Sequence, residues 1–167
     1  MSFSFLPDVI LTSVTDISPA QLQARNIRLL MMDFDNTIVP YTTSVPAKAV
    51  SDWLKAMQAS DIALCFVSNT KRERLGIFCR EYGLDYMTHA AKPSKKGFVR
   101  CMEKYGVAPC HAAMVGDQIF TDTLGGNRAG VFTILVPAIH NHNIWLKLRH
   151  VAEYPFIFLA RKRRSLS

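Results

Sequence analysis

The sequence lacks the features that mark secreted, membrane-spanning or disulfide-stabilised proteins. Its 167 residues include four cysteines, none in a Cys-x-x-Cys pair, and Cys65 lies inside an apolar run. We therefore expect free thiols in a reducing, cytoplasmic setting, and neither a disulfide framework nor a cysteine metal site. The first residues, MSFSFLPDVI, have no basic segment ahead of a long apolar one, so we expect no signal peptide. No apolar run approaches the roughly 20 residues that cross a bilayer.

Acidic residues are also scarce, with 13 against 20 lysines and arginines, which gives a formal net charge of +7. This charge favours anionic partners of some kind without identifying them. Basic residues do not alternate with aromatic ones in a stripe, so we expect no nucleic-acid partner. Hydrophobic residues, in contrast, make up 49% of the chain, which is typical of a globular protein. The length is sufficient for one domain with a hydrophobic core.

Apolar runs alternate with amphipathic segments along the chain. A nearly continuous apolar run such as IRLLMMDF (27–34) is typical of a strand that is covered on both faces. Further strands are expected within 62–70, 85–94, 112–117 and 130–136, and helices over 46–60, 71–83, 95–106 and a segment reaching about Arg128. The alternation predicts a three-layer, Rossmann-like α/β fold, in which helices cover both faces of a parallel sheet.

Polar residues stand where the expected strands end. These residues are Asp33, Asp35, Ser68, Asn69, Lys92, Asp117 and Asp122. Because the carboxyl ends of parallel strands meet at one edge of the sheet, we expect a single site there. Its four aspartates are too acidic to stand together alone, since neighbouring carboxylates repel one another. Lys92 and a hard cation with oxygen ligands, most simply Mg²⁺, would neutralise them.

The order of these residues resembles the four motifs of the haloacid dehalogenase (HAD) superfamily. The motifs stand here as DFDNT (33–37), VSNT (67–70), AKP (91–93) and GDQIFTD (116–122). The segment LPDVILTSVTDISPAQL (6–22) resembles the N-terminal approach of the YqeG-type branch, subfamily IIIA, whose relatives include phosphatases of phosphatidylglycerophosphate. The resemblance implies a HAD-like fold and a Mg²⁺-dependent phosphomonoester hydrolase that acts through an aspartyl-phosphate.

The resemblance also implies a role for each catalytic residue. Asp33 would be the nucleophile that attacks phosphorus. Asp35 would protonate the leaving oxygen and then deprotonate the hydrolytic water. A dehalogenase does not need this second acid, so Asp35 favours phosphoryl transfer. Lys92 would add positive charge as the transition state develops.

Binding roles follow from the same resemblance. Asp33, Asp117 and the backbone carbonyl of Asp35 would hold Mg²⁺. Ser68 and the backbone N–H groups of Phe34 and Asn69 would hold the phosphoryl oxygens of the substrate. Asp122 would orient Lys92 or a metal-bound water.

The gaps between the motifs leave no room for a cap domain, so we expect an open site. An open site suits a substrate carried by something large: a protein, a nucleic-acid end or a lipid headgroup. Alternatives remain open, namely a soluble small-molecule or protein phosphoester, a receiver-like signalling module, and a phosphate-binding scaffold without catalysis. Motif order argues against a receiver, which has its acidic pair first and its phospho-acceptor aspartate alone on the next motif strand.

We expect one domain over residues 1–167, with an N-terminal lead-in (1–26), a catalytic core (27–136) and a C-terminal extension (137–167). The extension combines apolar residues at helical spacing with the cluster Arg161, Lys162, Arg163 and Arg164. An apolar patch with a polybasic cluster is typical of peripheral membrane proteins. The alternative is a helix that docks on the domain itself and a solvated basic tail.

Overall fold

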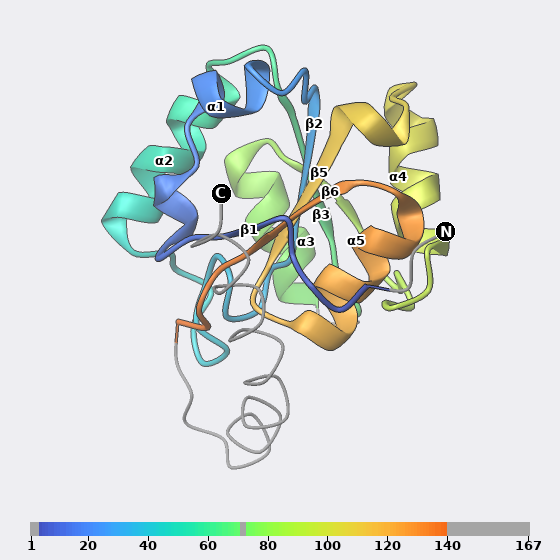
Figure 1. The fold of residues 1–167 in the computed structure, drawn as a ribbon. Coiled ribbons are helices and arrows are strands. Elements are labelled where there is room, and N and C mark those ends of the chain that lie inside the picture. The colour runs from blue at the N-terminus through green and yellow to red at the C-terminus, as the bar shows by residue number, and fades with distance from the viewer. Residues whose placement is uncertain (1–3, 71–72, 140–167) are drawn as a thin grey trace.

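The computed structural model of the protein describes residues 4–70 and 73–139. Within these ranges the strands form one sheet with the order β1-β6-β5-β2-β3-β4 (Figure 1). The strands are Val9–Ile10 (β1), Leu29–Met32 (β2), Ala63–Val67 (β3), Asp85–Met87 (β4), Ala112–Gly116 (β5) and Phe132–Leu135 (β6). Every neighbouring pair in the sheet is parallel, which confirms the predicted α/β fold.

Helices cover both faces of this sheet. They are Pro19–Gln23 (α1), Lys48–Gln58 (α2), Glu73–Tyr82 (α3), Lys96–Tyr105 (α4) and Leu124–Ala129 (α5). Buried side chains of α1, α2 and α3 share one core, and those of α4 belong to the core on the opposite face, where α5 packs beside α4. In Figure 1, α1 and α2 lie to the left of the sheet, and α4 and α5 lie to its right.

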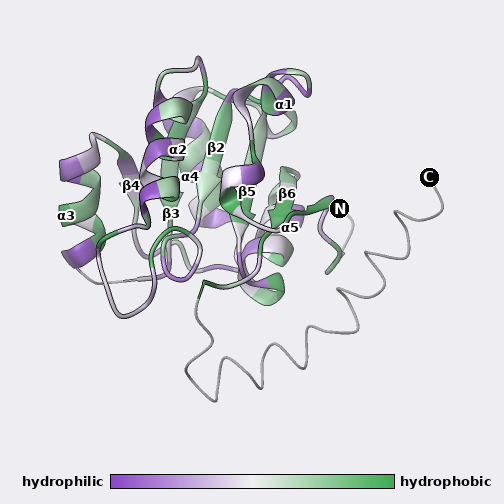
Figure 2. Cartoon of the chain, turned by 90° about the vertical axis from the view of Figure 1, so that its left-hand side faces the viewer, coloured by the Kyte–Doolittle hydropathy of each residue, from purple (hydrophilic) through white to green (hydrophobic). Residues whose placement is uncertain are grey.

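The residues of β2 explain why this part of the sequence is continuously apolar. Leu30 and Met32 point into the core beneath α2 and α3, whereas Leu29 and Met31 point into the core beneath α4. All four side chains are fully buried. Figure 2 shows the central strands in green, between helices that carry hydrophilic purple positions. A parallel strand that is covered on both faces has no solvent side, so it needs no polar residue until it ends.

The N-terminal lead-in contributes to the sheet, which the sequence did not predict. Strand β1 pairs with β6, so the first and last strands of the described chain lie side by side (Figure 1). The indole Nε1 of Trp53 on α2 also donates a 2.7 Å hydrogen bond to the carbonyl of Ile17. These contacts attach the lead-in to the domain core.

No inserted domain covers the carboxyl edge of the sheet within the described residues. Between Asp35 and α2 the chain forms a loop, and α3 is the element between β3 and β4. The described residues also contain no helix that is long and apolar enough to cross a bilayer. The predicted apolar and basic segment of the C-terminus falls within 140–167, outside the described residues.

Candidate active site

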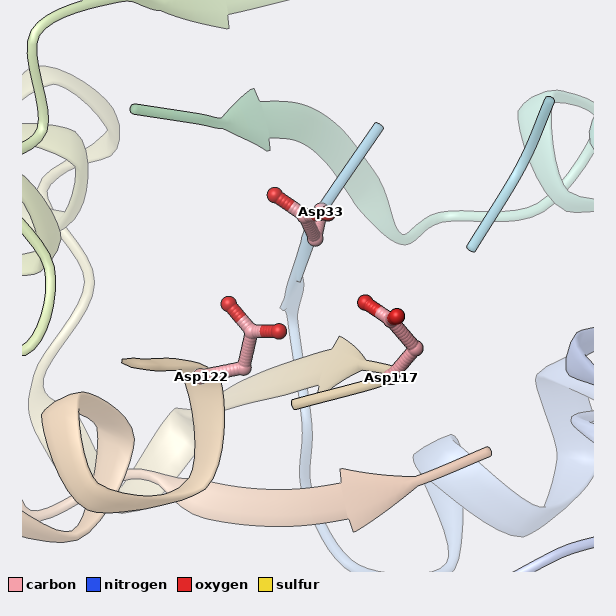
Figure 3. A group of neighbouring side chains, drawn as sticks. All are labelled: Asp33, Asp117 and Asp122. Atoms are coloured by element: carbon pink, nitrogen blue, oxygen red, sulfur yellow. The ribbon is translucent and has the colours of Figure 1, made fainter. Parts of the chain in front are cut away.

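Three of the predicted aspartates meet at the carboxyl edge of the sheet. Asp33 directly follows β2, and Asp117 directly follows β5, its neighbour in the sheet. Asp122 belongs to η3 (Ile119–Thr123), a single turn of π-helix of the kind that is frequent at functional sites. Carboxylate oxygens of the three residues lie within 4.8 Å of one another, and all three residues are buried (Figure 3).

Lys92 joins two of these carboxylates. Its ammonium nitrogen lies 2.6 Å from Oδ1 of Asp33 and 2.6 Å from Oδ1 of Asp122. Burial alone would lower the pKa of Lys92, but the charges of Asp122 and Asp33 outweigh it and raise the pKa above its usual value. Lys92 therefore stays protonated at neutral pH. Burial raises the pKa of Asp122 to about 6, against the opposing effect of Lys92.

Both oxygens of Asp122 are engaged within the protein. Oδ1 accepts from Lys92, and Oδ2 accepts a 3.2 Å hydrogen bond from the backbone N–H of Gln118. Asp122 was predicted to orient either Lys92 or a metal-bound water. Its contact with Lys92 favours the first of these roles, and favours it over a role as a metal ligand.

The remaining pair, Asp33 and Asp117, fits a hard cation. Oδ1 of Asp117 accepts a 3.4 Å hydrogen bond from the hydroxyl of Thr37, which fixes the side chain toward the loop after β2. The Lys92 ammonium is paired with Asp33 and Asp122, and the carboxylate oxygens of Asp33 and Asp117 lie within 4.8 Å of each other. Carboxylate oxygens are the ligands that Mg²⁺ prefers, and the donor set therefore suits it.

Ser68 and Asn69 lie at the end of β3, as predicted. The hydroxyl oxygen of Ser68 accepts a 3.2 Å hydrogen bond from the N–H of Thr70, which leaves the hydroxyl hydrogen to donate elsewhere. The side chain of Asn69 binds the backbone of Lys92 twice: its Nδ2 donates to the carbonyl at 3.0 Å, and its Oδ1 accepts from the N–H at 2.7 Å. Sequence reasoning gave Asn69 a backbone role and missed this contact.

Asp35 is turned toward a different cation, Arg74, which the sequence analysis did not identify. Arg74 lies in the first turn of α3, and its Nη2 forms an ion pair with Oδ1 of Asp35. Nη1 donates a 2.6 Å hydrogen bond to the carbonyl of Tyr41 in the loop that follows Asp35. The only signal in the sequence is the charged run KRER (71–74) after the VSNT motif, and the run does not indicate which residue faces the site.

Comparisons of the sequence with known proteins show that HAD-type phosphatases are among its relatives. A model of the HAD-hydrolase-like family matches residues 89–139. The probable phosphatase YqeG of Bacillus subtilis is 33% identical over 132 residues, which cover 79% of this chain and 77% of that protein. The chloroplastic and mitochondrial phosphatidylglycerophosphate phosphatase 1 of Arabidopsis thaliana is 26% identical over 171 residues, which cover 97% of this chain but 46% of that protein.

The fold itself is shared with solved structures. The deoxy-D-mannose-octulosonate 8-phosphate phosphatase of Haemophilus influenzae superposes with a TM-score of 0.55 at 15% identity, over 75% of each chain. At that identity the likeness concerns the architecture alone. The two proteins share the overall arrangement of strands and helices over the superposed part.

Proposed function

We propose that this chain, which belongs to the YqeG-type phosphatases of the HAD superfamily, hydrolyses phosphomonoesters in a Mg²⁺-dependent reaction through a phosphorylated Asp33. One observation carries the proposal. The Lys92 ammonium joins Asp33 to Asp122, and Asp117 lies beside them at the carboxyl edge of a parallel sheet. This edge is where α/β proteins bind their substrates.

In the first half of the reaction a carboxylate oxygen of Asp33 attacks phosphorus. The bond between phosphorus and the leaving oxygen breaks, and Asp35 gives its proton to that oxygen, so that an alcohol departs. Asp33 then carries the phosphoryl group as an acyl phosphate.

In the second half Asp35 takes a proton from a water molecule as the water attacks phosphorus. The bond between Asp33 and phosphorus breaks, inorganic phosphate leaves, and Asp35 again holds the proton that the next turnover needs. Two carboxyl groups, separated by one residue, thereby divide nucleophilic attack from proton transfer.

Groups around the nucleophile would stabilise the phosphoryl charge. The hydroxyl of Ser68 and the backbone N–H groups of Phe34 and Asn69 would donate to its oxygens, and Lys92 would add a positive charge. Asp33, Asp117 and the backbone carbonyl of Asp35 would hold Mg²⁺, which supplies positive charge between the anionic nucleophile and the anionic substrate.

A phospholipid phosphomonoester such as phosphatidylglycerophosphate is the proposed substrate. Support comes from the plant relative of that name, which matches along 97% of this chain. The absence of a cap over the described residues would let a headgroup enter from a membrane surface. The alternative is a soluble phosphoester, with the basic C-terminal cluster serving solvation and not membrane binding.

The catalytic proposal is tested with para-nitrophenyl phosphate and an alkyl phosphate, with Mg²⁺ and with a chelator. Asp33→Asn should lose at least about a thousandfold in rate, which corresponds to roughly 4 kcal/mol of barrier. Asp52→Asn on α2, whose side chain is 54% exposed, is the matched control and should keep normal activity. Acid-quenched enzyme should carry phosphate on the peptide that contains Asp33. Near-normal turnover by Asp33→Asn would overturn the proposal, and a receiver-like module would sustain no turnover at all.

The substrate is tested on vesicles that contain phosphatidylglycerophosphate, beside soluble glycerol 3-phosphate. A chain that ends at Ala160 lacks the four clustered basic residues, which are worth roughly 4 kcal/mol of attraction to anionic lipid at low salt. We expect the full chain to hydrolyse the lipid faster than the shortened chain at low salt. Higher kcat/KM on the soluble ester, with no vesicle binding by either chain, would favour the alternative.

A further inference from the structure

We propose that Arg74 is a positioning residue for Asp35: it binds Oδ1 and so orients the carboxyl group whose protonated form donates to the leaving group. This inference rests on the proposed function. Its basis is that two different cations bind the two neighbouring aspartates. Lys92 binds Asp33, two residues before Asp35, whereas Arg74 binds Asp35 itself. The nucleophile and the acid–base residue are thus held independently, from different elements of the fold.

The contacts of Arg74 fix more than one side chain. Its guanidinium pairs with Asp35 and also donates to the carbonyls of Pro40 and Tyr41, at 3.5 Å and 2.6 Å. The guanidinium is planar and rigid, so donors that are bound at several points leave it little freedom to rotate. The side chains of Arg74 and Asp35 are 17% and 11% exposed, so water competes weakly for these contacts. The loop after the nucleophile and the acid–base residue are therefore fixed together.

An aromatic cluster packs against one face of the Arg74 guanidinium and supports its position. The central carbon of the guanidinium lies 5.2 Å from the centroid of the Phe34 ring, within the range of a cation–π contact. The Phe34 ring makes edge contacts with Phe66 and Phe78, at 5.6 Å and 5.2 Å between centroids. Phe78 lies one helical turn after Arg74 on α3, so the same face of the helix supplies both the guanidinium and part of its support.

Arg74 occupies this place at a cost to local stability. Among the described residues, its Nε is the buried side-chain polar atom that finds no hydrogen-bond partner. It is also a cation in the first turn of a helix, where the helix dipole favours anions. A residue that was selected for stability alone would avoid both penalties. Such penalties are typical of groups that are retained for the geometry they impose.

The consequence for the reaction concerns the leaving group. Without Arg74 the Asp35 carboxyl can rotate away from the position where the leaving oxygen forms. An alkyl alkoxide is a poor leaving group and needs the proton as the bond breaks, whereas a nitrophenolate leaves without it. Loss of positioning therefore slows alkyl esters far more than nitrophenyl esters.

The test compares kcat/KM, which covers the steps up to departure of the alcohol, for para-nitrophenyl phosphate and glycerol 3-phosphate. Arg74→Met should lower kcat/KM for the alkyl ester about a hundredfold and for the aryl ester less than about fivefold. Arg74→Lys keeps the charge but not the planar fork, and should recover part of the alkyl activity. Arg80→Met, on an exposed position of the same helix, is the matched control and should change neither value.

The outcomes separate this inference from the proposed function. Equal losses for the two esters, or a loss confined to KM, would overturn the positioning role while leaving the phosphatase intact. If the wild-type chain hydrolyses neither ester, or if Asp33→Asn stays active, the proposed function itself is wrong. Thermal unfolding and circular dichroism are measured for every variant, and Arg74→Lys provides the comparison if Arg74→Met does not fold.

Discussion

A Cβ atom added to Gly116 would lie 2.3 Å from Oδ2 and 2.4 Å from Cγ of Asp122. Carbon atoms do not approach a carboxylate this closely, so a side chain at this position would displace Asp122. Gly116 thereby allows η3 to bring Asp122 against the end of β5. The same carboxylate binds the ammonium of Lys92 at 2.6 Å. Gly116, which has no reactive side chain, therefore helps to position Lys92 through Asp122.

We predict that Gly116→Ala disturbs the site through this contact. The displaced Asp122 should release Lys92, so kcat should fall at least about tenfold, and overpacking should lower the free energy of unfolding by about 1–3 kcal/mol. Gly76→Ala on α3 is the control, because the nearest atoms that its Cβ would meet belong to the ends of two side chains, Tyr86 at 3.2 Å and Arg80 at 3.6 Å. Steady-state kinetics and urea unfolding measure both effects. Normal kinetics in Gly116→Ala would show that the position of Asp122 does not matter to the reaction.

The arrangement of the site was predictable to the extent that each motif ends a strand. Asp33 follows β2 and Asp117 follows β5, and parallel strands deliver their carboxyl ends to one edge whatever their order in the sheet. Burial on both faces makes such strands visible as apolar runs, as in β2. Lys92 and Asp122 were therefore expected near Asp33 before any contact was known, and their hydrogen bonds lie there.

Contacts that depend on side-chain direction were not predictable. Arg74 is one of four charged residues in KRER, and helical spacing does not say which of them reaches Asp35. The amide of Asn69 binds the backbone of Lys92 across a loop, a relation with no periodic signal. Strand β1 has two residues, Val9–Ile10, too few to show the alternation of a strand.

Thiol accessibility provides a test of the packing. Cys65, Cys79 and Cys101 are buried, and Cys110 is exposed. Burial raises the pKa of Cys79 to about 12. A hydrogen bond with Cys65, and to a lesser extent burial, raises the pKa of Cys101. The thiols of Cys79 and Cys101 therefore remain protonated and unreactive.

We predict that Ellman's reagent titrates one thiol per chain in the native protein and four after denaturation. Cys110→Ser should abolish the native signal and leave three thiols in denaturant. Rapid reaction of a second thiol in the folded protein would contradict the buried positions of the other cysteines.

We predict that substitution of Asp117 impairs metal binding, whereas substitution of Asp122 impairs the positioning of Lys92. Asp117→Asn removes a proposed ligand, so the Mg²⁺ concentration that gives half-maximal activity should rise at least about tenfold. Asp122→Asn weakens the contact with Lys92, so it should lower kcat while leaving the Mg²⁺ requirement close to that of the wild type. Activity against Mg²⁺ concentration, with calorimetric titration of the metal alone, measures both. A larger metal defect in Asp122→Asn would make Asp122 the ligand and contradict the assignment.

The acid–base role of Asp35 is tested by a double-mutant cycle that combines Asp35→Asn with Arg74→Met. Asp35→Asn cannot donate or accept the catalytic proton, so kcat/KM for glycerol 3-phosphate should fall by about 10²–10⁴, whereas para-nitrophenyl phosphate should still phosphorylate Asp33 slowly. If Arg74 acts only through Asp35, adding Arg74→Met to Asp35→Asn should change kcat/KM for the alkyl ester by less than about threefold, although the single change costs about a hundredfold.

The same cycle on the aryl ester gives the control, since both changes should cost less for a leaving group that departs without a proton than for an alkyl leaving group. Additive losses on the alkyl ester would mean that Arg74 contacts the substrate or another part of the site directly. An equal loss for both esters in Asp35→Asn would exclude Asp35 as the general acid, because a proton donor must matter most where the departing oxygen is most basic.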